Sequence, residues 1–305
     1  MDIVAHRKTF YFISAALFLA SIASVFLWGL KFGIDFTGGS LIEVEFSGSR
    51  APVEELTRRL APLNLGEVRM QPTGEQGLFI RLRHIDEPTH QAVLAALTAG
   101  RPDGQSDSDV SEKRFDTIGP TIGKELAKKS ILAVILVIFL IVSYIAWAFR
   151  KVSLPIASWK YGITTVVALI HDVVIPTGFF AVLGRFYGFE VDTLFITAIL
   201  TILGFSVHDT IVVFDRIREN LKNSNTQGDF GVLVNRSVRQ TFTRSVNTSL
   251  TVVLAMIAVY IFGGETTRAF SLTLVIGVIV GTYSSIFIAS PLLVTWYSFA
   301  QRREG

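Results

Sequence analysis

Long apolar segments alternate with short polar connectors along most of the chain. Six of these segments are long enough to cross a bilayer, which takes roughly 20 mostly apolar residues in a helix. They occupy residues 10–30, 130–149, 161–184, 193–214, 245–264 and 269–300. The pattern predicts an α-helical multi-pass membrane protein with six transmembrane helices. The last segment is too long for one untilted span, so we expect it to bend or to lie partly at the interface, with Pro291 as the cause of a bend.

The one long polar segment lies between the first and second apolar segments, at residues 31–125. Residues 40–46 alternate between apolar and polar side chains, as in a strand with one buried face. After this strand we expect two helices at 53–63 and 88–99, and three strands at 67–72, 77–85 and 111–118, with residues 101–109 as a polar loop. The order β-α-β-β-α-β is that of a ferredoxin-like α+β domain.

The chain is therefore expected in three parts: the N-terminus with the first span at 1–30, an extracytoplasmic domain at 31–125, and a five-helix transmembrane bundle at 126–305. Basic residues near the ends of spans favour the cytoplasmic side. With both termini in the cytoplasm, the short outer loops keep only Arg185 and Arg268. The inner side then holds Arg7, Lys8, Arg150, Lys151, Lys160, Arg216, Arg218, Lys222, Arg236, Arg239, Arg244, Arg302 and Arg303.

Composition agrees with a membrane protein, since 50% of the residues are apolar and only 17% are charged. Residues 31–125 carry a net charge of −4 and the remainder +7, so the overall +3 reflects topology and does not indicate nucleic-acid binding. The chain has no cysteine, which excludes disulfides, thiolate nucleophiles and Cys-ligated metals. The first apolar segment exceeds the 7–15 residues of a signal-peptide core. We therefore expect it to be a retained span.

One segment imitates a nucleotide-binding motif. Residues 119–125 place glycines and a lysine much as a P-loop does, but only three residues separate the glycines and Glu125 stands where Ser or Thr would bind magnesium. We interpret this segment as a turn leading into a helix. The sequence contains no hydrolytic or redox motif, so we expect neither enzymatic activity nor a bound cofactor or metal.

Ionisable residues inside the spans are the candidates for function, because each costs about 2.5–3.5 kcal/mol at the centre of a membrane helix. Asp209 lies towards the cytoplasmic end of the fourth segment, and Arg244 begins the fifth segment on the same side. A carboxyl group whose contact with an arginine changes between two conformations can load and release a proton. We assign Asp209 and Arg244 to proton or ion translocation. A static ion pair, or for Arg244 a positive-inside anchor, are the alternatives.

Three further polar residues lie inside the spans and are candidates for supporting roles. His171 and Asp172 are adjacent in the third segment, and adjacent helical residues point about 100° apart, so we expect them to face different surroundings. His208 precedes Asp209, where an imidazole can tune or relay the proton.

Two other groups of residues have a structural interpretation. Asp215 and Arg216 begin a charged run where the fourth segment ends, which we interpret as a helix end that fixes topology. Gly204, Gly277 and Gly281 are small enough to let membrane helices approach closely, so we expect them to mediate helix packing.

The order of several motifs resembles the SecF members of the SecD/SecF family of bacterial protein-export membrane proteins, which is related to the resistance-nodulation-division transporters. The resemblance rests on the segments FGIDFTGG at 32–39, GPTIGKEL at 119–126, HDV at 171–173, GFSVHDT at 204–210, FDRIREN at 214–220, RSVNTS at 244–249 and GTYSS at 281–285. It implies a subunit that works with SecD and uses the proton gradient to assist late stages of preprotein export, after the ATP-driven step.

The resemblance further implies contacts with the Sec translocon channel, and contacts of the outer domain with the translocating preprotein. It places the family's proton-linked acid and arginine at Asp209 and Arg244, while His208 stands where the family usually has Asn. Two alternatives remain from the residues: half of a proton-coupled small-molecule exporter, and a non-coupling scaffold for SecD. The sequence also leaves sodium open as the coupling ion.

Overall fold

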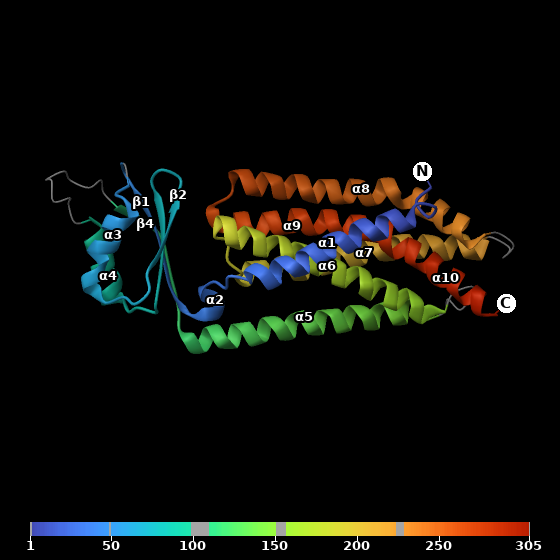
Figure 1. The fold of residues 1–305 in the computed structure, drawn as a ribbon, viewed down its shortest axis with the longest axis horizontal. Helices are drawn as coiled ribbons and strands as arrows, with labels where there is room; N and C mark the ends of the chain where they lie inside the picture. Colours follow the sequence, from blue (N-terminus) through green and yellow to red (C-terminus); the bar gives the residue numbers. More distant parts are fainter. Residues whose placement is uncertain (1, 49, 99–109, 151–156, 224–228, 305) are drawn as a thin grey trace. The chain divides into compact units, whose positions relative to one another are not determined.

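The computed structural model describes residues 2–48, 50–98, 110–150, 157–223 and 229–304 (Figure 1). The chain divides into two compact units, Phe32–Ile131 and Met1–Lys31 with Leu132–Gly305. The polar loop predicted at residues 101–109 and the basic residue Lys151 lie outside the described residues.

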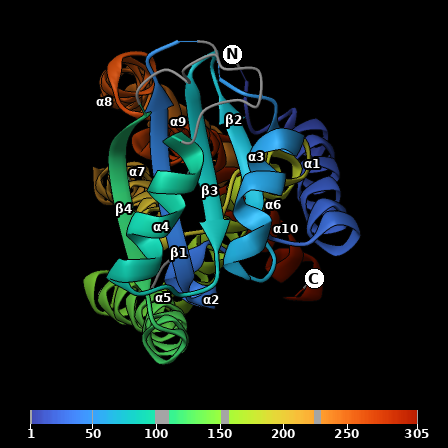
Figure 2. The same cartoon turned by 90° about the vertical axis from the view of Figure 1, so that its left-hand side faces the viewer.

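The smaller unit is an antiparallel four-stranded sheet with two helices on one face (Figure 2). Its strands stand in the order β2-β3-β1-β4. In chain order the elements are β1 (Gly39–Phe46), α3 (Val53–Leu60), η1 (Ala61–Leu63), β2 (Arg69–Thr73), β3 (Gly77–Leu82), α4 (Glu87–Thr98) and β4 (Val110–Ile118). This order confirms the predicted ferredoxin-like arrangement.

The core of this unit lies between the sheet and its two helices. Alternate residues of β1 and β3 point into it, because successive side chains of a strand face opposite sides. Ile42 and Val44 of β1 and Ile80 of β3 are completely buried there, against Leu56 of α3 and Val93 of α4. The alternation seen in the sequence is therefore the burial pattern of the sheet.

A short helix, α2 (Ile34–Thr37), precedes β1 and was not predicted. Two glycines join it to the strand. Gly38 has φ +74°, and a Cβ there would lie 2.8 Å from Pro120 Cα. Gly39 has φ +125°, and its Cβ would lie 2.7 Å from Leu82 O. Both positions need glycine because of backbone conformation and because neighbouring backbone leaves no room for a side chain.

The larger unit consists mostly of membrane-spanning helices, one of which begins at Pro120 within the smaller unit. Six helices in the described residues are long and apolar enough to cross a membrane. They are α1 (Arg7–Trp28), α5 (Pro120–Ala148), α6 (Ser158–Tyr187), α7 (Thr193–Asn223), α8 (Phe230–Phe262) and the continuous run α9 (Glu265–Ser284), η2 (Ser285–Ala289) and α10 (Ser290–Glu304). The spans of α6, α7 and the last helix are about half buried or more, whereas those of α1, α5 and α8 are mostly exposed.

Two details of the spans differ from the prediction. Helix α8 begins at Phe230, capped by the Asp229 carboxylate, and not at residue 245, because an apolar run measures the membrane crossing and not the full helix. The last span is interrupted by the π-helical segment η2 and not at Pro291 itself. Pro291 follows this segment and has no N–H to donate to the preceding turn, which is compatible with wider hydrogen bonding there.

Candidate functional site

Two carboxyl groups lie in the interior of the larger unit, one on α6 and one on α7. Asp172 is fully buried and Asp209 is 4% exposed. They lie inside because α6 and α7 pack against each other and against α9 and η2. In the part of the chain that the structure describes, these carboxyl groups accept hydrogen bonds from serine hydroxyls, and Asp172 also contacts an imidazole. These two carboxyl groups form a polar site inside a mostly apolar bundle.

Asp172 has partners on three helices. Its Oδ2 accepts hydrogen bonds from Ser206 Oγ of α7 at 2.5 Å and from Ser284 Oγ of α9 at 2.6 Å. Its Oδ1 lies 2.8 Å from His171 Nδ1. The ring of His171 in turn stacks on Tyr283, with centroids 6.4 Å apart. His171 and Asp172 were expected to face different surroundings, but both are buried and contact each other.

Asp209 faces the hydroxyls of α8 and of the last span. Ser285 Oγ donates to Asp209 Oδ2 at 3.1 Å, and the hydroxyls of Ser245 and Thr282 face the same carboxyl group. Thr282 also forms a short hydrogen bond with Ser249 of α8. The hydroxyl groups can donate to an ionised carboxylate and accept from a protonated one, so they suit both charge states.

The contact predicted between Arg244 and Asp209 is not formed. Arg244 is exposed, and no ion pair or hydrogen bond joins these two described residues. The reason is the inward face of α8, which consists of hydroxyl residues four positions apart: Ser237, Thr241, Ser245 and Ser249 are all buried. Arg244 directly precedes a member of this row and therefore points about 100° away from it.

Polar and small residues also occupy the outward faces of two spans. On α7 the exposed positions Thr197, Thr201, Gly204 and His208 recur every three or four residues, and on α8 Arg244, Asn247, Thr248 and Thr251 are exposed. We call these eight residues the outer polar face. The four threonine hydroxyls donate to carbonyls of their own helices, but lipid chains cannot hydrogen-bond the side chains of His208, Arg244 and Asn247, which favour a surface for protein or water.

The three glycines predicted to mediate packing behave differently. A Cβ at Gly277 would lie 2.1 Å from Ile202 Cδ1, and a Cβ at Gly281 would lie 3.1 Å from Ser206 Cβ. These two glycines let α9 approach α7. The packing role expected of Gly204 is not found within this chain, because Gly204 faces outward and no described atom lies within 4 Å of a Cβ built there.

The charged end of α7 contacts α8. Arg216 Nη1 lies 2.5 Å from Glu219 Oε2, and its Nε donates to Gln240 Oε1 at 2.7 Å. Asp215 Oδ1 lies 3.5 Å from Arg218 Nη1 and is exposed. These contacts are those of a helix end outside the apolar span. No group of three or more His, Cys, Asp or Glu residues converges as a metal site in the described ranges.

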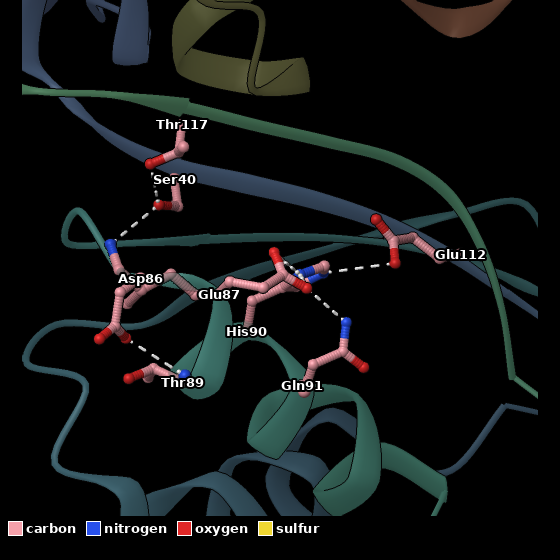
Figure 3. A network of polar contacts seen from close by, with 9 residues as sticks. Ser40, Asp86, Glu87, Thr89, His90, Gln91, Glu112 and Thr117 are labelled. Carbon is pink, nitrogen blue, oxygen red and sulfur yellow. Dashed lines mark hydrogen bonds and ion pairs between the residues drawn. The ribbon is translucent and has the colours of Figure 1, made fainter.

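A second polar network lies in the smaller unit, around His90 of α4 (Figure 3). The buried His90 ring stacks on Phe115 of β4 at 3.8 Å between centroids. Its Nδ1 lies 3.3 Å from Glu87 Oε2 and its Nε2 lies 3.3 Å from Glu112 Oε2. Asp86 caps the helix by accepting from the Thr89 amide at 3.2 Å. The network holds the first turn of α4 against β4.

This first turn of α4 is expected to loosen in acid. Hydrogen bonds from Thr89 hold the pKa of Asp86 below its ordinary value, and a hydrogen bond from the Gln91 side chain does the same for the pKa of Glu87. Their stabilising contribution is present above the unfolded-state pKa values of about 4 and is lost as the pH falls through the lowered values. Amide exchange of α4 in the full chain, corrected for intrinsic rates, should therefore accelerate in acid.

The matched variant is Asp86→Asn, which keeps the size of the capping side chain but does not titrate. We expect the acid-dependent increase in exchange to shrink in this variant. An identical pH dependence in both proteins would contradict the assignment.

Comparison with known proteins identifies the family. Residues 103–299 match the family described as protein export membrane protein SecD/SecF, C-terminal, and residues 29–49 match the SecD/SecF GG motif. The chain belongs to the SecD/SecF family. The GG motif includes Gly38 and Gly39, whose conformations and close backbone contacts require glycine. SecD/SecF proteins are membrane components of protein export and not enzymes.

Relatives match over nearly the whole chain. The protein translocase subunit SecF of Thermobaculum terrenum is 42% identical over 97% of this chain and 94% of its own length. That of Anaerolinea thermophila is 39% identical over 98% of this chain and 94% of its own length. These identities make this chain a multi-pass subunit of the SecF type.

Longer relatives carry the matching region within one larger chain. The crystal structure of SecDF, a translocon-associated membrane protein from Thermus thermophilus, aligns with a TM-score of 0.81 and 30% identity over 98% of this chain and 39% of that chain. SecDF of Bacillus subtilis is 34% identical over 97% of this chain and 38% of its own length. The chain thus spans about two fifths of SecDF. The SecDF relatives join a SecD part and a SecF part in one chain, which supports association of this chain with SecD.

Proposed function

We propose that this chain is a proton-driven subunit of the Sec export machinery, which acts with SecD in the late stages of preprotein translocation across the cytoplasmic membrane. The observation that carries the proposal is Asp209, a carboxyl group buried within a membrane span among hydroxyls. Ionisable groups are retained in such surroundings chiefly where they bind ions or protons. Asp209 takes up a proton from one side and releases it to the other.

The position of Arg244 supports a site completed by SecD. Arg244 lies on the outer polar face, beside the inward row of hydroxyls that reaches Asp209. An arginine at this place within a span requires polar partners, and a second membrane subunit supplies them. A movement of SecD against α7 and α8 then changes the surroundings of Arg244 and of Asp209 together. The exposed imidazole of His208 lies on the same face.

The distribution of charge supports the orientation. Basic residues concentrate at the ends of spans on the side of both termini, which supports a cytoplasmic position for those ends. The smaller unit, Phe32–Ile131, then lies on the outer side, where a preprotein emerges. The spans α1 and α5, which precede and follow this unit in the chain, transmit conformational changes around Asp209 to the smaller unit. The smaller unit contacts the emerging preprotein.

The proposal is tested by export into inverted membrane vesicles that lack this chain. Adding the chain with SecD should accelerate completion of export, and an uncoupler should remove that acceleration. Acceleration that survives the uncoupler would contradict proton coupling and favour a scaffold. If the acceleration depended on a sodium gradient instead, sodium would be the coupling ion. Proton flux stimulated by a small molecule, without SecD, would favour an exporter.

The outer polar face gives a prediction about assembly. Gly204 has no described atom within 4 Å of an added Cβ, so Gly204→Leu fits within this chain. If SecD covers this face, the added side chain overpacks the contact at a cost of about 1–3 kcal/mol. The dissociation constant for SecD should then rise about tenfold, and less SecD should be recovered with the purified chain.

The matched control for this prediction is Gly264→Leu at the exposed residue before α9, which also has no described atom within 4 Å of its Cβ. It should leave recovery of SecD unchanged. Equal recovery of SecD with both variants would contradict the location of the interface.

A further inference from the structure

Two consecutive serines touch both buried carboxyl groups. Ser284 is the last residue of α9 and Ser285 the first of η2, and both are fully buried. Ser284 Oγ lies 2.6 Å from Asp172 Oδ2 on α6, and Ser285 Oγ lies 3.1 Å from Asp209 Oδ2 on α7. Because adjacent helical residues point about 100° apart, the two side chains contact different helices: Ser284 contacts α6 and Ser285 contacts α7.

Each of these hydroxyls has two acceptors for its single hydrogen. Ser284 Oγ also lies 3.0 Å from Gly281 O, and Ser285 Oγ lies 3.0 Å from Thr282 O. A hydroxyl donates one hydrogen bond at a time. An ionised carboxylate attracts this hydrogen about twice as strongly as a neutral acceptor does. A protonated carboxyl group instead donates its own hydrogen to the serine oxygen, and the serine then donates to its own helix.

The backbone at this turn is not a regular α-helix. The carbonyl of Ser285 accepts from Ser290 Oγ at 2.9 Å, and the π-helical segment runs to Ala289. Such segments occur frequently at functional sites. A change in the hydrogen bonds to Gly281 and Thr282 therefore acts on the turn that enters this irregular segment. Each serine hydroxyl therefore responds to the charge of one carboxyl group. Because the two serines are adjacent in the chain, a change in the hydrogen bonds of one acts on the backbone next to the other.

We propose that Ser284 and Ser285 couple Asp172 to Asp209, so that a proton bound at one carboxyl group changes the proton affinity of the other. Asp172 is then a second proton-binding group, and the two serines are positioning residues. The relevance to export rests on the proposed function, whereas the coupling is a property of this chain itself. Other titratable groups lie near the pair: His171 contacts Asp172, Tyr283 stacks on His171, and His208 is next to Asp209 in the chain but is exposed on the outward side of α7.

The test is an infrared titration of the full chain in lipid, which follows the carboxylic-acid bands assigned by Asp172→Asn and Asp209→Asn. The quantity compared is the shift in the protonation midpoint of Asp209 that Asp172→Asn causes. This shift is measured once with both serines present and once in a chain that also carries Ser284→Ala. We expect a shift of about one pH unit or more with the serines, as for a coupled pair. In Ser284→Ala the shift should fall to less than half.

Two further variants keep the outcome decisive. Ser285→Ala breaks the other contact and should reduce the coupling in the same way, so the test does not depend on one variant folding. Ser271→Ala removes a buried serine of α9 whose hydroxyl donates to Arg268 O, and it should leave the coupling intact. An equal shift with and without the serines, or no shift in either, would overturn the proposal.

This outcome is separate from that of the proposed function. If the coupling is measured but Asp209→Asn retains gradient-dependent export, the proposed function fails and the coupling stands. If Asp209→Asn loses that export while the shift caused by Asp172→Asn is equal with and without the serines, the coupling fails alone.

Discussion

Replacement of Asp209 by asparagine is expected to abolish the part of preprotein export that depends on the proton gradient, and to leave the ATP-driven part. Asparagine has nearly the volume of aspartate, and its carbonyl oxygen can still accept from Ser285 Oγ, which lies 3.1 Å from the carboxylate. It cannot take up a proton at neutral pH. The measurement is the export rate in vesicles that contain this chain, SecD and the translocon, with and without an uncoupler.

The matched control is Asp215→Asn on the same helix. Asp215 is exposed at the charged end of α7, where its Oδ1 lies 3.5 Å from Arg218 Nη1, and an exposed pair of this kind contributes little. This variant should keep the difference between coupled and uncoupled vesicles. If the uncoupler slowed export equally in Asp209→Asn and in the unaltered chain, Asp209 would not be the proton-carrying group.

Replacement of Gly178 by valine is expected to destabilise the bundle strongly. A Cβ at Gly178 of α6 would lie 2.3 Å from Ser21 Cβ and 2.4 Å from Ser21 Cα on α1. The second contact is with backbone, so a rotamer change cannot relieve it and the two helices must separate. Overpacking of this kind costs about 3 kcal/mol or more. The thermal unfolding midpoint in detergent should fall by on the order of 10 °C.

Gly204→Val provides the comparison for this prediction, because no described atom lies within 4 Å of its Cβ. Its unfolding midpoint without SecD should stay within experimental error of the unaltered chain. Equal midpoints for the Gly178 and Gly204 variants would show that α1 and α6 do not meet at Gly178.

The sequence is sufficient to predict the spans and the main helices and strands of the smaller unit, because their signals are local. A span needs a certain length of apolar residues, and a half-buried strand alternates, so the six spans and the ferredoxin-like order could be read directly. The GG segment shows the limit of this reasoning. Gly38 and Gly39 are required by backbone atoms of Pro120 and Leu82, which are distant in the chain. No local pattern reveals such a contact.

The site was predicted only in part, for a similar reason. Asp209 stands out because a carboxyl group is rare within an apolar span. The partner of Asp209 depends on which face of α8 turns inward, and that face holds Ser245 and not Arg244. A row of Ser and Thr at four-residue spacing was present in the sequence and could have indicated this face. The role of Ser284 and Ser285 needed the packing of three helices.

We propose that protons pass through the site around Asp209. The most direct measurement is proton flux into proteoliposomes that contain this chain and SecD, with a pH indicator enclosed and a proton gradient imposed. We expect flux above that of protein-free liposomes, and we expect Asp209→Asn to remove it while Asp215→Asn does not. Equal flux through the unaltered chain and Asp209→Asn would contradict the claim.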